Sequence, residues 1–272
     1  MYDLKNKTVL ISGVSSGIGR KFAEVLITKY DCKVYGIARN EAKILEFKAS
    51  LNEKSENFKG YYLFDVSEET AWENLAKTLD SDNIKIDVVI NCAGYLPDFK
   101  KFDGISTHEF KKVMETDFFS CVYSVKYLTS IVKTSDTPAV INISSSSALA
   151  TFSGISGYSS AKSALKNFTL VLAEEYRNQI FFSCVCPGFT YTDIFSRMNL
   201  NEKESNLIKK FSSSPDKIVK KTLRKIKRKK KLIVVGYDAK FMSLFYKLAP
   251  NLTSKIITNV LKKSKLEMFD KL

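Results

Sequence analysis

Tyr158 and Lys162 stand four positions apart in the segment Tyr-Ser-Ser-Ala-Lys. On a helix this spacing places both side chains on one face, with their ends within reach of each other. A lysine ammonium beside a phenol favours the phenolate, so we expect it to lower the tyrosine pKa from its ordinary value near ~10. A single Tyr-x-x-x-Lys pair is weak evidence for a functional site, because in a chain rich in both residues this spacing will occur by chance. It nevertheless predicts a phenol able to donate or accept a proton near neutral pH.

A glycine-rich turn lies close to the N-terminus. Residues 7–12 predict a buried strand, and residues 20–27 have helical periodicity. Between them Gly13, Gly17 and Gly19 follow the spacing G-x-x-x-G-x-G. A strand, a glycine turn and a helix form the arrangement that binds dinucleotides, because the glycines let backbone approach a pyrophosphate at the helix N-terminus. The alternative is a glycine-rich turn of an α/β protein that binds no nucleotide.

Ser145 follows a predicted strand over residues 138–144 and precedes Tyr158 by thirteen residues. A strand end that leads back into a helix can place the serine hydroxyl beside the tyrosine hydroxyl. Two hydroxyls that converge on one oxygen would form a site for a carbonyl or an alcohol. The alternative is an ordinary loop serine, since residues 144–147 are all serine and loops are rich in this residue.

Together these residues resemble the short-chain dehydrogenase/reductase family over about residues 5–240. Ser12 departs slightly, since the family usually has Thr before the first glycine. The motifs that carry the resemblance, in chain order, are Ser12-Gly13-x-x-x-Gly17-Ile18-Gly19, Asp65-Val66, Asn91-Cys92-Ala93-Gly94, Ser145, Tyr158-x-x-x-Lys162, Pro187-Gly188 and Thr192. The resemblance implies an oxidoreductase that transfers a hydride between a nicotinamide cofactor and a carbonyl or secondary alcohol.

The resemblance also implies roles for individual residues. Tyr158 exchanges the proton, Lys162 binds the nicotinamide ribose, and Ser145 hydrogen-bonds the substrate oxygen. Asp65 contacts the adenine, residues 91–94 lie along the adenosine, and Thr192 with the backbone after Pro187 holds the carboxamide. The full set implied to bind the cofactor is Gly13, Ser15, Ser16, Gly17, Ile18, Gly19, Asp65, Val66, Asn91, Ala93, Gly94, Tyr158, Lys162, Pro187, Gly188, Thr190 and Thr192.

Asp117 departs from the family pattern, which has a fourth catalytic residue, Asn, at this position. In relatives the Asn main-chain carbonyl holds a water that links the lysine to solvent. If the main chain performs that role, Asp117 can substitute. If the side-chain amide is required, the proton relay is impaired, and an ionised Asp117 could pair with Lys162. We expect activity to be retained.

Arg39 follows the second predicted strand, where an acidic residue would hold the ribose 2′-hydroxyl of NAD. An arginine there can stack on adenine and pair with a 2′-phosphate, with Ser15 and Arg20 as possible helpers. The sequence therefore favours NADP(H) over NAD(H). The alternative is that Arg39 is a solvated residue at a helix start.

Strands and helices are expected to alternate along the chain. The strands read as continuous apolar runs, which is typical of a parallel sheet covered on both faces. We therefore predict an α/β fold with a doubly wound, seven-stranded, mostly parallel sheet (a Rossmann fold), with all the motifs at its carboxyl edge. Predicted strands span 7–12, 33–38, 58–64, 86–91, 138–144, 180–186 and 231–235. Predicted helices span 18–30, 40–54, 67–80, 107–133, 157–178, 215–229 and residues beyond 239.

Composition narrows the function classes. The 272 residues can form one large α/β domain, and no run of about 18 apolar residues predicts a membrane span. The first predicted strand begins too early to leave room for a signal peptide, so we expect a cytoplasmic protein. The five cysteines are scattered and lack metal-binding spacing, so we expect them to be reduced and to bind no metal. A single histidine, His108, argues against a Ser-His-Asp hydrolase.

The C-terminal quarter carries all the excess charge. Residues 201–272 contain 20 Lys and Arg against 6 Asp and Glu, whereas residues 1–200 contain 23 of each sign. Apolar residues at helical spacing follow from Phe241 onward, so residues 217–272 could bind an anionic membrane surface. The alternative is a helix packed on the domain or on a second subunit. No recognition motif accompanies the charge, which argues against nucleic acid.

We expect a catalytic domain over residues 1–238 and a helical extension over 239–272. A substrate lid is expected at about 192–214. Its apolar residues (Phe195, Met198, Leu200, Leu207, Ile208 and Phe211) would join Tyr95, Leu96, Phe152 and Ile155 to form a pocket for a sterol, retinoid, sphingoid or long-chain acyl substrate. Alternatives are a small-metabolite or acyl-carrier ketoreductase, and a weakly active NADP(H)-binding sensor or scaffold. The resemblance implies a homodimer or homotetramer.

Overall fold

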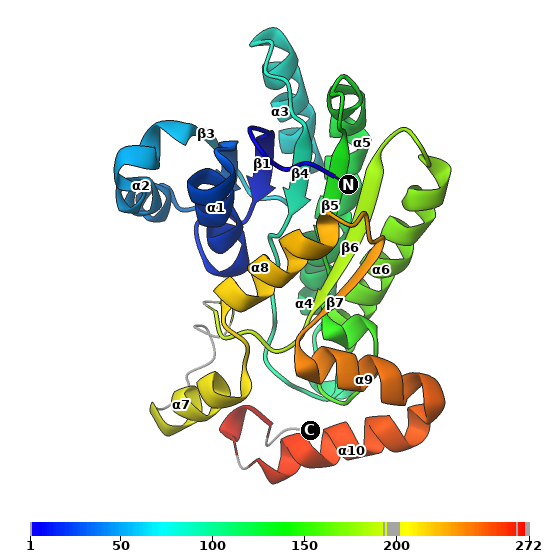
Figure 1. The fold of residues 1–272 in the computed structure, drawn as a ribbon. Helices are drawn as coiled ribbons and strands as arrows, with labels where there is room; N and C mark the ends of the chain where they lie inside the picture. The colour runs from blue at the N-terminus through cyan, green and yellow to red at the C-terminus, as the bar shows by residue number, and fades with distance from the viewer. Residues whose placement is uncertain (1, 193, 195–201, 265, 270–272) are drawn as a thin grey trace.

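Among the residues that the computed structural model describes (2–192, 194, 202–264 and 266–269), seven parallel strands form one sheet in the order β3-β2-β1-β4-β5-β6-β7. The doubly wound parallel sheet expected from the sequence is confirmed (Figure 1). The strands are β1 (Thr8–Ser12), β2 (Lys33–Ala38), β3 (Phe58–Leu63), β4 (Val88–Asn91), β5 (Ala139–Ile143), β6 (Phe181–Pro187) and β7 (Leu232–Val235).

Helices cover both faces of the sheet, which explains why its strands are apolar throughout. On one face α1 (Gly17–Tyr30), α2 (Glu41–Ser50) and α8 (Pro215–Ile226) pack on β1, β2 and β7. On the other face α3 (Glu69–Ser81), α5 (Ser120–Lys133) and α6 (Ser156–Glu175) surround Trp72 and Phe182. The strand order reverses beside β1, so a crevice opens at the carboxyl ends of β1 and β4.

The helix predicted over residues 107–133 is interrupted. It consists of α4 (Thr107–Met114), a π-helical turn (Glu115–Phe119) and α5. A π turn inserts an extra residue into the helical ladder and often occurs at functional sites. Here it places Asp117 in the interior, where the side chain is fully buried.

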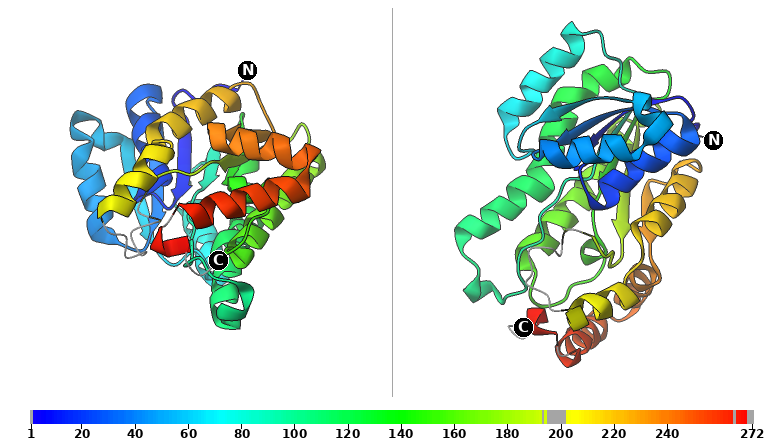
Figure 2. Two further views of the ribbon diagram at one scale, coloured as in Figure 1. Left: turned by 90° about the horizontal axis from the view of Figure 1, so that it is seen from below. Right: turned by 90° about the vertical axis from the view of Figure 1, so that its left-hand side faces the viewer.

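The C-terminal part follows the expected helical pattern. After α7 (Glu202–Phe211), α8 and β7, the chain forms α9 (Tyr237–Leu248), α10 (Pro250–Lys263) and a short 3-10 turn (Glu267–Phe269). Helices α9 and α10 make an antiparallel pair across the lower end of the molecule, away from the N-terminus (Figures 1 and 2). Of the expected lid, Phe195, Met198 and Leu200 lie outside the described residues, as do the side chains of Leu207 and Phe211.

Candidate active site

A cavity of about 300 Å³ opens at the carboxyl edge of the sheet. It is lined by loops that follow β1, β2, β3, β4, β5 and β6, so the parallel topology brings together motifs that are far apart in sequence. All the site residues predicted from the sequence line this cavity except Asn91 and Asp117. Those that line it are Gly13, Ser15, Ser16, Gly17, Ile18, Gly19, Arg39, Asp65, Val66, Ala93, Gly94, Ser145, Tyr158, Lys162, Pro187, Gly188, Thr190 and Thr192.

The glycine turn forms a cradle that larger residues would fill. Gly13 and Gly17 have φ angles of +74° and +55°, in the region that favours glycine. A Cβ on Gly19 would lie 2.2 Å from the carbonyl oxygen of Gly13, so α1 can approach the turn only without a side chain there. The Ser12 hydroxyl accepts hydrogen bonds from the N–H groups of Cys92 and Ala93, which joins the ends of β1 and β4. This backbone surface at the start of α1 fits a pyrophosphate.

Arg39 lies at the end of the cavity beside β2. Its guanidinium donates a hydrogen bond of 2.9 Å to the Asp65 carboxylate, and the arginine side chain is 59% exposed. Burial would raise the pKa of Asp65, but hydrogen bonds from Ser67 and then from Arg39 hold it below its ordinary value. Arg20, by contrast, pairs with Glu46 and does not line the cavity.

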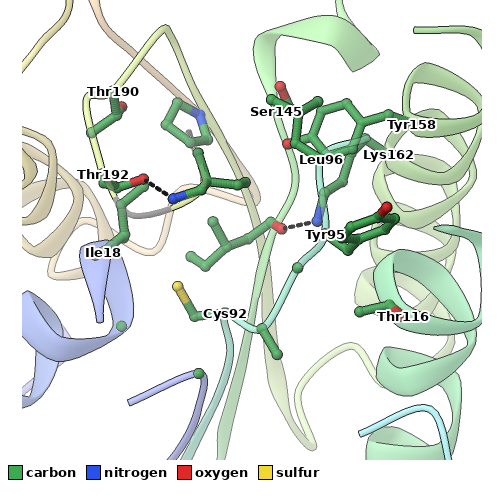
Figure 3. Close-up of a pocket in the computed structure, with 18 of the residues that line it drawn as sticks. Ile18, Cys92, Tyr95, Leu96, Thr116, Ser145, Tyr158, Lys162, Thr190 and Thr192 are labelled. Carbon is green, nitrogen blue, oxygen red and sulfur yellow. Dashed lines mark hydrogen bonds between the residues drawn. The ribbon is translucent and has the colours of Figure 1, made fainter. Parts of the chain in front are cut away.

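Ser145 and Tyr158 lie side by side on the opposite wall of the cavity (Figure 3). The Ser145 hydroxyl accepts a hydrogen bond from the N–H of Ser147, which fixes the serine at the end of β5. Tyr158 and Lys162 are one helical turn apart on α6, and the Lys162 ammonium is 5.6 Å from the centre of the Tyr158 ring. The two hydroxyls and the ammonium thus share one wall, as their spacing predicted.

Asp117 and Lys162 form a buried ion pair, with 2.9 Å between a carboxylate oxygen and the ammonium nitrogen. The carboxylate also accepts hydrogen bonds from the N–H of Tyr95, at 3.2 and 3.1 Å, and the ammonium donates to the carbonyl of Ile143. Gly94 lies against the pair, since a Cβ there would approach the carboxylate to 2.8 Å. The possibility that Asp117 pairs with the active-site lysine is therefore realised in the structure.

These contacts change the expected pKa values. Burial alone would lower the pKa of Lys162, but the Asp117 carboxylate raises it, so the ammonium stays charged. The predicted net lowering of the Tyr158 pKa is wrong. Burial raises the pKa of Tyr158, and the Asp117 charge adds to that increase, while the Lys162 ammonium and a hydrogen bond with Ser145 oppose it.

Asn91 does not line the cavity, although it was expected along the adenosine. Its side-chain amide donates to the Asn142 side chain at 2.8 Å, and Asn142 donates to the Thr169 hydroxyl. All three residues are buried, so this chain of hydrogen bonds connects β4, β5 and α6 beneath the site. This hydrogen-bond chain joins β4, β5 and α6, and the place of Asn91 at the end of an apolar strand does not reveal these partners.

The remaining wall of the cavity is apolar. Tyr95, Leu96, Phe152 and Ile155 line it as predicted. The sequence did not single out Phe99, Phe189 or Ile194, which also contribute. Leu266 and Phe269 from the end of the chain join the same cluster, and the Phe269 ring packs edge-on against Phe99 with 4.8 Å between centres. Only the tertiary fold brings the C-terminal turn to this wall.

Comparison with known proteins agrees with this geometry. A family model described as short chain dehydrogenase matches residues 7–203. An uncharacterized oxidoreductase of Saccharomyces cerevisiae is 32% identical, over 72% of this chain and 74% of its own length. A benzil reductase of the same yeast, which forms (S)-benzoin, is 30% identical over 69% of this chain and 73% of its own length. A 3-ketodihydrosphingosine reductase of Bos taurus is 27% identical, over 79% and 67% of the two chains.

Solved structures show the same fold. A short chain dehydrogenase of Shigella flexneri complexed with NADP superposes with a TM-score of 0.76, covering 86% of this chain and 99% of its own, at 23% identity. One of Escherichia coli complexed with NADPH gives a TM-score of 0.74, covering 86% and 97%, also at 23% identity.

Replacing Asp117 by asparagine tests the ion pair. The variant keeps the side-chain shape but removes the negative charge that raises the Tyr158 pKa. If Tyr158 is the proton acceptor in alcohol oxidation, as the family resemblance implies, the rising limb of the kcat/KM profile should move to lower pH, and the rate at neutral pH should rise ~10-fold or more. Asp80→Asn removes an exposed carboxylate of α3 that does not line the cavity, and serves as the control. An unchanged profile would show that the charge of Asp117 does not reach the phenol.

The glycine cradle is tested by Gly19→Ala. Its added Cβ would overlap the Gly13 carbonyl, so the start of α1 must move away from the cavity. NADPH affinity, measured by fluorescence titration, should fall at least ~10-fold, because the lost contacts are charge-assisted hydrogen bonds. The matched control is Gly60→Ala, where the new Cβ meets only the Tyr35 ring at 3.4 Å. Equal affinities in the two variants would contradict a dinucleotide site here.

Proposed function

Because this chain belongs to the short-chain dehydrogenase family, we propose that it is an NADPH-dependent oxidoreductase acting on a lipophilic carbonyl or the corresponding secondary alcohol. The observation that carries this proposal is the convergence of Ser145, Tyr158 and Lys162 on one wall of a cavity whose other end is a glycine cradle.

Each residue of the site has a separate role in the proposed reaction. When bound, the nicotinamide supplies or accepts a hydride. The Ser145 and Tyr158 hydroxyls hold the substrate oxygen between them, and Tyr158 gives that oxygen its proton during reduction. Burial and the Asp117 charge raise the pKa of Tyr158 and the Lys162 ammonium opposes that rise, so the lysine is the group that favours proton transfer from the phenol. Lys162, held by Asp117 and by the Ile143 carbonyl, places a fixed positive charge beside the phenol.

Arg39 supports NADPH as the cofactor. It is a largely exposed guanidinium at the end of β2, where a 2′-phosphate would lie, and β2 offers no acidic residue there. Asp65 holds it in place without removing it from the cavity wall. The two structural neighbours described above were crystallised with NADP and NADPH, in agreement with this choice.

The apolar wall supports a lipophilic substrate. Leu96, Phe99, Phe152 and Ile155 face the cavity next to Tyr158, so the part of a substrate beyond its carbonyl would meet no charge among them. Relatives named for a diaryl diketone and for a sphingoid ketone act on carbonyls of this character. A soluble acyl-carrier or small-metabolite ketoreductase is the alternative that a substrate panel would separate.

One observation favours a second candidate function, that of an NADP(H)-binding sensor with weak catalysis. The Asp117 charge partly cancels the effect of Lys162 on Tyr158, and the family pattern that this chain resembles has asparagine at this position. A sensor would bind NADPH and turn over no substrate. The peripheral location at a membrane, the homo-oligomer and the division at residue 238 also stay predictions. No helix in the described part of the chain is long and apolar enough to cross a bilayer.

Tyr158→Phe tests the proposed reaction. NADPH oxidation is followed with a panel of carbonyls that includes benzil, a 3-ketosphinganine and short soluble ketones. Wild type should reduce the lipophilic members fastest, and the variant should lose ~10²–10⁴-fold in kcat while NADPH affinity stays within about twofold. Leu45→Ala, an exposed change on α2, controls for handling. NADPH binding without turnover of any carbonyl by wild type would favour the sensor.

Arg39→Ala tests the cofactor choice. The lost charge-assisted hydrogen bond should reduce kcat/KM for NADPH ~10–100-fold and leave the value for NADH nearly unchanged. The matched control is Arg20→Ala, which removes an arginine that pairs with Glu46 outside the cavity. A wild-type preference for NADH would overturn this assignment.

A further inference from the structure

The α9–α10 hairpin turns its polar side toward the protein. The Thr151 hydroxyl shares hydrogen bonds with Tyr246 of α9, at 3.1 Å, and with Ser254 of α10, at 2.9 Å. The Thr258 hydroxyl accepts one from the N–H of Ser153. A helix on a water-soluble domain ordinarily buries its apolar stripe and exposes its polar one. This hairpin buries Ala239 and Met242 of α9 and Thr253 of α10, but it exposes most of its large apolar side chains.

Its outer side carries exposed apolar side chains along both helices. Among the residues that the structure describes, fourteen large hydrophobic side chains are exposed, and eight of them lie between residues 237 and 260. Phe241 is 50% exposed and Leu248 is 74% exposed. The eight residues, which we call the hairpin face, are Tyr237, Phe241, Leu244, Phe245, Leu248, Leu252, Ile256 and Val260. Clusters of exposed apolar side chains often mark interaction sites.

Lysines surround the start of the hairpin face. The Lys217 and Lys221 ammonium groups of α8 lie over the Tyr237 ring, at 5.5 and 5.0 Å from its centre. Burial lowers the pKa of Lys225, and the charges of Lys240, Lys221 and Lys230 lower it further, which shows how closely these cations gather. A tyrosine flanked by lysines beside an apolar stripe is the composition of a membrane interface.

Charge decides between the possible occupants. The hairpin itself carries five lysines, at 240, 247, 255, 262 and 263, and Asp238 as its sole acid. That acid faces inward, because its carboxylate accepts a hydrogen bond from the N–H of Phe189. A two-fold contact between two hairpin faces would bring the lysines of both copies together. None of the described residues of this face is an acid that could pair with them. An anionic bilayer supplies both the negative charge and the apolar interior.

We infer that the hairpin face docks on the surface of an anionic membrane, with Lys217 and Lys221 of α8 at the lipid headgroups. This deepens the proposed function and rests on it for the lipophilic substrate. Leu261 continues α10 into the apolar wall, where it meets Leu266 and Phe269 beside Phe99 and Tyr158. Docking would therefore bring the apolar end of the active-site cavity next to the bilayer, and Figure 2 shows the hairpin on the side of the molecule where the strands end.

Vesicle co-sedimentation tests this inference with the full chain. Wild type is mixed with vesicles of phosphatidylcholine alone, and of phosphatidylcholine with phosphatidylserine. It should bind the anionic vesicles and lose binding as salt is added. Phe241→Ser with Leu248→Ser should weaken binding at least ~10-fold, and Lys217→Glu with Lys240→Glu should do the same. The matched controls are Leu45→Ser with Phe102→Ser, and Lys48→Glu with Lys85→Glu, which change exposed residues elsewhere.

Two results would overturn the inference. Wild type that stays in solution with anionic vesicles has no membrane-docking face. The second result is a dimer of wild type, seen by light scattering, that the double variant Phe241→Ser with Leu248→Ser converts to a monomer. In that case a second copy of the chain, and not a membrane, covers the hairpin face. NADPH oxidation with a soluble ketone is measured for every variant and should remain at the wild-type rate. Vesicle binding by a wild type that reduces no carbonyl of the panel, lipophilic members included, would leave the docking face intact and contradict the proposed reaction instead.

Discussion

The ion pair between Asp117 and Lys162 joins four parts of the chain at one buried point. The carboxylate comes from the π turn before α5 and the ammonium from α6, while Tyr95 contributes its N–H and Ile143 its carbonyl. A buried charge left without its partner costs ~3–5 kcal/mol, so these segments must be positioned together or not at all. The active-site wall is thus held by an electrostatic requirement as well as by packing.

The same pair also affects the pKa of Tyr158. A free ammonium beside Tyr158 would favour the phenolate, but a neighbouring carboxylate partly cancels its field. Burial adds to this effect because it disfavours any charge on the phenol. The net result is a raised pKa, so the phenol holds its proton more strongly than an ordinary tyrosine does. The pKa of Tyr158 therefore follows from the surroundings of the motif and not from the motif alone.

The sequence predicted the sheet closely because its strands are continuous apolar runs bounded by polar residues, and such patterns need no tertiary information. Ser145, Tyr158 and Lys162 could be placed on one wall for a similar reason, since the spacing on α6 and the strand-end rule are both local. The π turn at Asp117, the structural part of Asn91 and the sign of the Tyr158 pKa shift were not accessible in this way. Each depends on burial and on a partner distant in sequence.

The hairpin illustrates the same limit in another form. Periodicity at Phe241, Leu244, Phe245 and Leu248 predicts an apolar stripe, but it does not say whether the stripe faces the core. That outcome depends on the surface against which the helices pack. Here Thr151 and Ser153, next to the apolar wall of the cavity, offer hydroxyl and N–H groups. Tyr246, Ser254 and Thr258 bond to those groups, so polar side chains of the hairpin meet this loop while its large apolar side chains are exposed, an arrangement that depends on residues about a hundred positions away in sequence.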